Sequence, residues 1–149
     1  MLLNIVIGLI IPWIIGIFLY FKEKELLLTT FPFASSLALV INAWGFNRNY
    51  WNLYPFECEH ISDIPFDIGL YPIIGVYMLY FIRHTKLKPY FIISYAILLT
   101  TFLEFLGVLS GRVFYANGWN LLYTFFSYIF PYIIFYYFYL YLIKLKILK

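Results

Sequence analysis

The sequence has few charged residues, a single cysteine and no glutamine. Only 11% of its 149 residues are Asp, Glu, Lys or Arg, and 64% are hydrophobic, whereas soluble domains have about 25% charged and about 45–50% apolar residues. A chain of this length cannot bury so much apolar surface, because a small globule has too much surface for its volume. The composition therefore excludes a soluble enzyme, a disordered tail and a secreted disulfide scaffold, and it indicates an integral membrane protein.

The low cysteine count and the modest net charge exclude further classes. Cys58 has no second cysteine to pair with, so no intrachain disulfide forms. A formal net charge of +3 gives little support to a nucleic-acid partner. Glu57, Glu59, His60 and Asp63 lie close together, but their spacing matches no established metal site, and zinc usually takes more His or Cys. We expect a solvated acidic loop there, and neither a metal nor a cofactor.

The sequence is rich in long apolar segments. Charged clusters separate five of them, each about 19–23 residues long, which at about 1.5 Å per residue is enough to cross a hydrocarbon core of about 30 Å. Helices are expected, because a helix satisfies its backbone hydrogen bonds internally. The sequence thus predicts a single all-α transmembrane domain over residues 1–149, a polytopic bundle of about five helices at residues 2–20, 26–46, 64–82, 89–109 and 121–143.

The distribution of positive charge predicts the orientation of the bundle. Of the ten lysines and arginines, only Arg48 and Arg112 fall on one side of a five-helix bundle. The positive-inside rule places the other, basic side in the cytoplasm, so we expect a multi-pass protein of the cell membrane with the N-terminus outside and the C-terminus cytoplasmic. The outer side collects most of the polar residues and a set of interface aromatics: Trp44, Trp51, Tyr54, Tyr115 and Trp119. We expect any functional site at this outer end.

Glu104 is the most informative single residue. An ionisable side chain inside a membrane span is costly and usually faces the bundle interior or a cavity. It belongs to a small and polar stripe at helical spacing, formed by Thr100, Thr101, Glu104, Gly107 and Gly111. The two glycines make a GxxxG motif, which lets another helix approach closely. A structural hydrogen bond or ion pair, a ligand or proton site, and a snorkelling side chain are the interpretations open for Glu104.

Asp63 and Asp67 flank Pro65 where the third span begins. Proline suits the first turn of a helix, and acidic side chains there complement the helix dipole, so a structural role at the helix start is one interpretation of both. Asp67 also lies about a turn inside the span, where it can point at Glu104 and form an acid/base pair or a cation site with it. Arg112 follows the fourth span closely, and we expect it to be the counter-charge of one of these carboxylates.

Several short motifs carry a resemblance to a known family. They are Ile64-Pro65-Phe66-Asp67 with Tyr71-Pro72 after it, a basic turn, a span with Glu104 and Gly107, and then Tyr115 and Trp119 before a last aromatic helix. Over roughly Asn42 to Leu142, the chain resembles an uncharacterised family of small multi-pass membrane proteins of spore-forming Gram-positive bacteria. The resemblance implies location and architecture, and it points to Pro65, Asp67, Pro72, Glu104, Tyr115 and Trp119 as positions to test. A weaker similarity links the chain to small carotenoid-cyclase domains, whose Pro-and-paired-Glu motif it lacks.

Three classes of function remain open. We favour a non-enzymatic membrane protein that binds a partner or a small apolar ligand at its outer end, with these candidate binding residues: Asp63, Asp67, Glu104, Arg112, Tyr115 and Trp119. A membrane enzyme with Glu104 and Asp67 as acid and base is the first alternative, although no nucleophile, metal or cofactor motif accompanies them. A small transporter or channel subunit is the second, although the chain has no repeated halves. The expected partners are the lipid bilayer and another membrane protein or a second copy of this chain.

Overall fold

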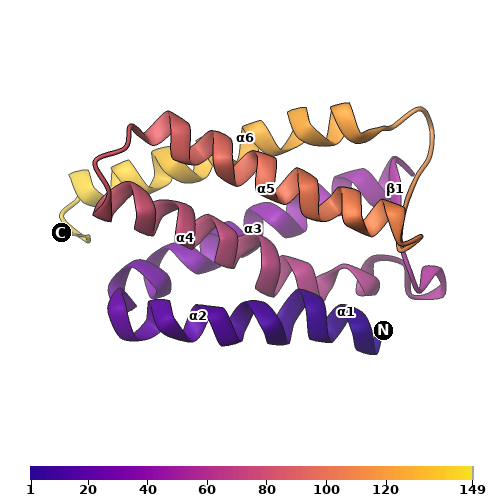
Figure 1. Cartoon of the computed structure of the whole chain (residues 1–149), viewed down its shortest axis with the longest axis horizontal. Coiled ribbons are helices and arrows are strands. Elements are labelled where there is room, and N and C mark those ends of the chain that lie inside the picture. The colour runs from indigo at the N-terminus through magenta and orange to yellow at the C-terminus, as the bar shows by residue number, and fades with distance from the viewer. Residues whose placement is uncertain (149) are drawn as a thin grey trace.

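Helices aligned along one long axis make up most of the computed structural model, which describes residues 1–148 (Figure 1). In this part of the chain, five helical segments are long and apolar enough to cross a membrane: Leu2–Lys22, Lys24–Asn47, Phe56–His84, Pro89–Leu109 and Leu121–Lys144. The prediction of an all-α membrane bundle with five spans is confirmed. The chain is a multi-pass helical membrane protein.

Two short strands complement the helices. In chain order the elements are α1 (Leu2–Ile5), a π-helical segment (Val6–Ile10), α2 (Ile11–Lys22), α3 (Lys24–Asn47), β1 (Trp51–Leu53), a 3₁₀ helix (Phe56–Ser62), a second π-helical segment (Phe66–Leu70), α4 (Tyr71–His84), α5 (Pro89–Leu109), β2 (Val113–Tyr115) and α6 (Leu121–Lys144). The strands pair antiparallel, with Trp51 opposite Tyr115. The sequence did not predict this ribbon, because strands of three residues are too short to show an alternating pattern.

A wide π-helical turn precedes a proline in both the first and the third span. Gly8 and Gly69 lie in these two turns, where the backbones approach so closely that a Cβ on Gly69 would collide with the Gly8 carbonyl oxygen. Pro72 has no N–H to donate to the carbonyl of Ile68, four residues earlier. The indole of Trp13 donates to that oxygen instead, at 3.0 Å. The first and third spans are therefore locked together where the proline interrupts the third helix.

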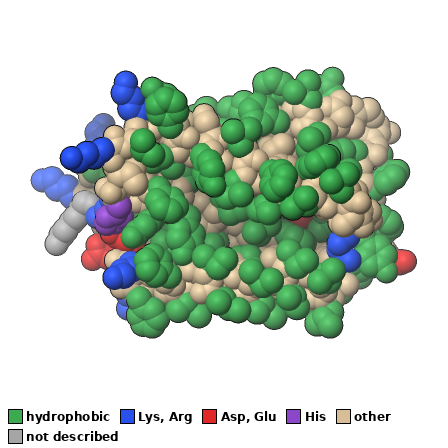
Figure 2. All heavy atoms as spheres, viewed as in Figure 1, with side chains coloured by type: hydrophobic (Ala, Val, Ile, Leu, Met, Phe, Trp, Pro, Cys, Tyr) green, Lys and Arg blue, Asp and Glu red, His purple; other side chains and the backbone are tan. Residues whose placement is uncertain are grey.

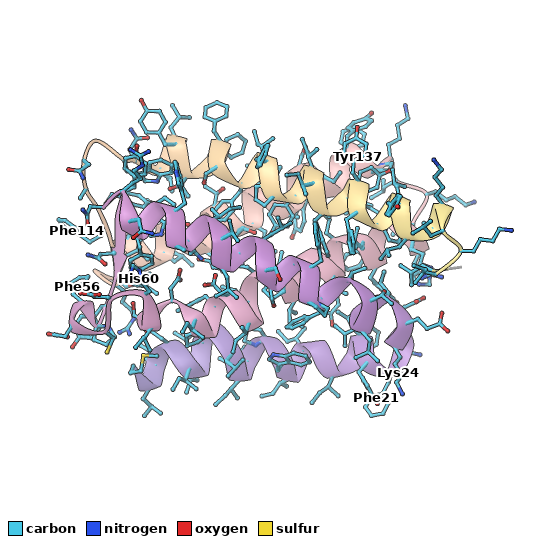
Figure 3. The ribbon with its side chains drawn as sticks, turned by 180° about the vertical axis from the view of Figure 1, so that it is seen from behind. Phe21, Lys24, Phe56, His60, Phe114 and Tyr137 are labelled. Carbon is cyan, nitrogen blue, oxygen red and sulfur yellow. The ribbon has the colours of Figure 1, made fainter. Side chains whose placement is uncertain are left out.

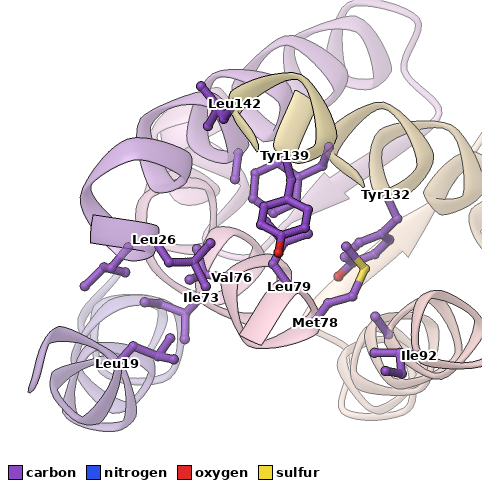
Figure 4. Packing of buried hydrophobic residues seen from close by; sticks show 14 of the residues in the cluster. Leu19, Leu26, Ile73, Val76, Met78, Leu79, Ile92, Tyr132, Tyr139 and Leu142 are labelled. Atoms are coloured by element: carbon purple, nitrogen blue, oxygen red, sulfur yellow. The ribbon is translucent and has the colours of Figure 1, made fainter. Parts of the chain in front are cut away.

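The third span lies at the centre of the bundle. Half of its most apolar stretch is buried inside the protein, against a third or less for each of the other four spans. Val76 and Leu79 of α4 are fully buried, and they pack with Leu19 of α2, Leu26 of α3 and Tyr139 of α6 (Figure 4). Because lipid chains are as apolar as these side chains, close van der Waals packing holds such a core together.

The two ends of the bundle differ in charge. Basic side chains gather at the end that holds the C-terminus (Figure 2), which we call the basic end. There Glu23 pairs with Arg83 at 3.2 Å and with His84 at 2.7 Å, which joins the α2–α3 turn to the end of α4. The opposite end, which we call the ribbon end, carries the N-terminus and the β1–β2 ribbon (Figure 1). Loops that the sequence assigns to one side of the membrane thus meet at one end.

Candidate functional site

Asn4 anchors the first helix to the loops of the ribbon end. Its side chain is 1% exposed, and its Nδ2 donates to the carbonyl oxygens of Tyr54 and Ser62, both at 2.8 Å. Its Oδ1 accepts a hydrogen bond from Arg112 at 2.7 Å, and the Arg112 guanidinium lies 5.3 Å from the centre of the Tyr54 ring. Three segments far apart in sequence are fixed to one another by this single buried amide.

An aromatic cluster packs beside this anchor. The ring of Trp119 lies 4.7 Å from Tyr50, 5.0 Å from Trp51 and 6.1 Å from Trp44. Gly45 of α3 leaves room for the Trp51 ring, because a Cβ at this position would collide with the ring. Offset and tilted aromatic pairs of this kind contribute about 0.5–1.5 kcal/mol each beyond the burial of their surface. The cluster holds the ribbon against α3.

Glu104 is surrounded by hydroxyl groups. The Tyr115 phenol donates to its Oε1 at 2.6 Å, the Tyr128 phenol donates to its Oε2, and the Thr124 hydroxyl lies 3.2 Å from Oε1. Thr124 in turn accepts the indole N–H of Trp119 at 2.9 Å. The network joins α5, β2 and α6, and it gives both carboxyl oxygens of Glu104 a hydrogen-bond donor.

Tyr115 is the phenol of this network that lies outside the membrane-spanning helices. Burial, followed by the charge of the neighbouring Glu104 carboxyl, raises the pKa of the Tyr115 phenol above its ordinary value. The phenol therefore keeps its proton at neutral pH and remains a donor to Glu104. The sequence placed Tyr115 among the candidate binding residues, and the structure places it behind Glu104 as its donor.

Asp67 and Asp63 are both buried, with exposed fractions of 2% and 3%, but they differ in their partners. Asp67 Oδ1 accepts a hydrogen bond from the side-chain amide of Asn42 at 2.6 Å. Asp63 starts the third membrane helix through its main chain, since its carbonyl accepts the N–H groups of Phe66 and Asp67. Its side-chain Oδ2 has no hydrogen-bond partner. A buried polar atom without a hydrogen-bond partner costs about 1–3 kcal/mol, so the burial of Asp63 Oδ2 needs an explanation.

A small cavity brings Asp63 and Glu104 together. Its volume is about 30 Å³, which is room for roughly two water molecules. We call it the carboxyl cavity after the polar part of its wall, which consists of Asn42, Asp63, Tyr71, Glu104, Thr124 and Tyr128 together with Ser127. Asp67 joins it through Asn42, and Asp63 interacts electrostatically with both Asp67 and Glu104. Three carboxyls of the third and fourth spans thus share one buried region.

Within residues 1–148, no basic side chain forms an ion pair with these carboxyls. The ion pairs of this part of the chain lie at the basic end. We expected Arg112 to be their counter-charge, but its hydrogen-bond partner is Asn4. Within the same residues, no group of three or more His, Cys, Asp and Glu side chains is arranged to hold a metal ion. The polar wall of the cavity therefore consists of carboxyl, amide and hydroxyl groups, with no basic side chain among them.

The GxxxG motif of the fourth span does not pack against another helix. The helix ends at Leu109, so Gly111 lies beyond it, in a turn with φ +68°, a conformation that favours glycine. Gly107 faces Val113 of β2, whose Cγ2 would lie 2.8 Å from a Cβ at this position. The small residues let the ribbon, rather than a helix, approach α5.

Five polar residues of the cavity wall were absent from the sequence-based candidates: Asn42, Tyr71, Thr124, Ser127 and Tyr128. Asn42 carries a recognisable signal, because an amide within an apolar span needs a partner just as a carboxyl does. The tyrosines carry none, since the chain has 16 tyrosines and only the packing shows which of them face Glu104. Of the predicted set, Trp119 lies beside Thr124 and Arg112 beside Asn4.

Models of protein families, curated proteins and solved structures were compared with the chain, and none of them matches it. The resemblance to a family of small membrane proteins therefore stays a prediction.

Proposed function

We propose that the protein binds a small, membrane-soluble ligand in the carboxyl cavity, at the end of the bundle that faces the outside of the cell. The observation that carries this proposal is Oδ2 of Asp63, which is buried, lines the cavity and has no hydrogen-bond partner. Ionisable side chains inside a membrane are expensive and mark binding sites or ion pathways. A ligand that donates to Asp63 removes the cost of burying this oxygen alone.

The contrast with Glu104 supports a binding role for the cavity. Both oxygens of Glu104 have hydroxyl donors from within the protein, so this carboxyl is held in place before any ligand arrives. Asp63 is held at its main chain while its side-chain Oδ2 remains unpaired. One oriented carboxyl and one carboxyl with a vacant acceptor form the kind of small polar set that fixes a ligand in an otherwise apolar site.

The charge distribution supports the orientation. Basic side chains gather at the end opposite to the ribbon (Figure 2), and the positive-inside rule places that end in the cytoplasm. We therefore propose a single-domain protein of the cell membrane whose ribbon end faces outward, an arrangement that agrees with the family resemblance noted in the sequence.

Mass spectrometry of co-purifying small molecules tests the binding function. The wild type, Asp63→Asn, Glu104→Gln and Glu57→Gln are purified in a mild detergent, with Glu57→Gln as the matched control at an exposed carboxyl. We expect the wild type and Glu57→Gln to carry the same small molecule beyond bulk lipid, and Asp63→Asn to have lost it. Equal small-molecule content in all four proteins, or none beyond bulk lipid in the wild type, contradicts the proposal.

A further inference from the structure

A second cavity of different character adjoins the carboxyl cavity. Its volume is about 60 Å³, and it lies between α3, α4 and α6. Most of its wall is apolar, and small residues widen it: Ala34 and Ala38 on α3, and Gly75 on α4, with Pro131 and Phe135 of α6 opposite. Ala38 and Pro131 are partly exposed, so the cavity opens sideways toward the bilayer, on the face where α3 and α6 run side by side (Figure 3). We call it the apolar groove.

The groove and the carboxyl cavity share part of their walls. Ile41, Asn42, Tyr71 and Tyr128 line both. Of these, Asn42 binds Asp67 and Tyr128 binds Glu104, so the apolar groove ends where the carboxyl network begins. A molecule lying in the groove thus presents one end to the bilayer and the other to three carboxyls.

We propose that the ligand is a single-chain amphiphile with a primary amine head, which enters sideways from the bilayer between α3 and α6. The ammonium head lies in the carboxyl cavity beside Asp63 and Glu104, and the alkyl chain lies in the apolar groove. This inference rests on the proposed binding function and adds the chemical class of the ligand and its route of entry.

Charge and hydrogen bonding select the amine head. Three carboxyls share the region, and no ion pair within residues 1–148 joins them to a basic side chain, so an ammonium head finds carboxyl partners for which no other cation competes. An ammonium group also carries three N–H donors and no acceptor, which matches a wall that offers Oδ2 of Asp63 without a donor. A fatty-acid head would add a further acidic group, and an alcohol would donate only once.

The size of the cavity further restricts which head groups fit. Its volume of about 30 Å³ accommodates roughly two water molecules. A primary ammonium is of this size, whereas a quaternary head with three methyl groups is larger and offers no N–H donor. The alkyl chain needs no closed pocket, since it continues from the groove into the lipid.

Unfolding midpoints in phosphatidylcholine nanodiscs test this inference, with dodecylamine, dodecanol and butylamine as probes. We expect dodecylamine to raise the midpoint of the wild type by about 3 °C or more at saturation, and dodecanol and butylamine to raise it much less. Asp63→Asn should abolish the dodecylamine shift. Ala38→Phe, which fills the groove without touching a carboxyl, should abolish it too, and Ala43→Phe at an exposed position of the same helix should keep it. Ala38→Leu serves as the milder groove variant if Ala38→Phe does not fold.

Failure of this inference can be told apart from failure of the proposed binding function. An equal shift with dodecanol overturns the amine head, and equal shifts with butylamine and dodecylamine that Ala38→Phe leaves unchanged overturn the groove. If neither amine shifts the wild type, the inference as a whole is wrong. The binding function itself then depends on the co-purification experiment, which makes no assumption about the ligand.

Discussion

Asp63 and Glu104 line the same buried cavity, but only Glu104 has hydrogen-bond donors for both of its carboxyl oxygens. Oδ2 of Asp63 has none. A carboxyl with a full set of partners stabilises the fold, whereas a buried carboxyl oxygen without a partner costs free energy. The two residues are therefore expected to respond in opposite ways when each is changed to its amide.

Glu104→Gln should lower the free energy of unfolding by about 1–2 kcal/mol. The amide keeps the shape of the side chain, but its NH₂ group replaces an oxygen that accepts a hydrogen bond from a tyrosine. Unfolding by sodium dodecyl sulfate in mixed micelles measures the change. Glu57→Gln, at an exposed carboxyl, should have no measurable effect, and an equal loss in both variants would contradict the structural role of Glu104.

Asp63→Asn should leave the free energy of unfolding unchanged or raise it by about 1 kcal/mol in the absence of ligand. The substitution replaces an ionisable carboxyl that is 3% exposed with a neutral amide and keeps the main-chain carbonyl that starts the helix. The same micelle titration measures it. A clear loss of stability would show that Asp63 supports the fold rather than a ligand.

Tyr115→Phe should make the protein less sensitive to alkaline pH. Burial and the Glu104 carboxyl raise the pKa of the Tyr115 phenol in the folded state above its unfolded value of about 10. The unfolded chain then releases this proton first, so the free energy of unfolding falls as pH rises above about 10. Tyr115→Phe lacks that proton, and its unfolding free energy should fall less steeply over the same range. Equal slopes for both proteins between pH 9 and about 11 would argue against this prediction.

The reactivity of Cys58 tests the orientation of the protein in the membrane. It is the single cysteine of the chain and lies in the 3₁₀ helix of the ribbon end, partly exposed. On intact cells it should react with a membrane-impermeant maleimide, because the ribbon end is proposed to face outward. Cys58→Ser provides the background. Labelling that appears only after the membrane is permeabilised would reverse the orientation.

The spans were predictable from the sequence because each is a local property: clusters such as Lys22 to Glu25 and Arg83 to Lys88 separate apolar stretches of membrane length. The carboxyls were predictable as candidates for the same reason, since Asp67 and Glu104 stand inside such stretches. The difference in hydrogen bonding between Asp63 and Glu104 does not depend on the neighbouring sequence. The donors to Glu104 come from β2 and α6, and the ribbon that positions β2 depends on three-residue strands more than 50 residues apart.

The partner of Arg112 was likewise not predictable from the sequence. Its place after the fourth span made it the expected counter-charge of the carboxyls, yet Asn4, 108 residues away, accepts its hydrogen bond. An amide near the N-terminus carries no sequence signal of a particular partner. Arg112 is therefore engaged with Asn4, and Oδ2 of Asp63 has no hydrogen-bond partner.

The affinity of dodecylamine for the wild type and for Asp63→Asn, measured by native mass spectrometry of the nanodisc complexes, tests the central claim most directly. The account predicts a dissociation constant at least about tenfold larger for Asp63→Asn, a difference of about 1.4 kcal/mol, with the folded protein equally stable or more so. Equal affinities for the two proteins would contradict it.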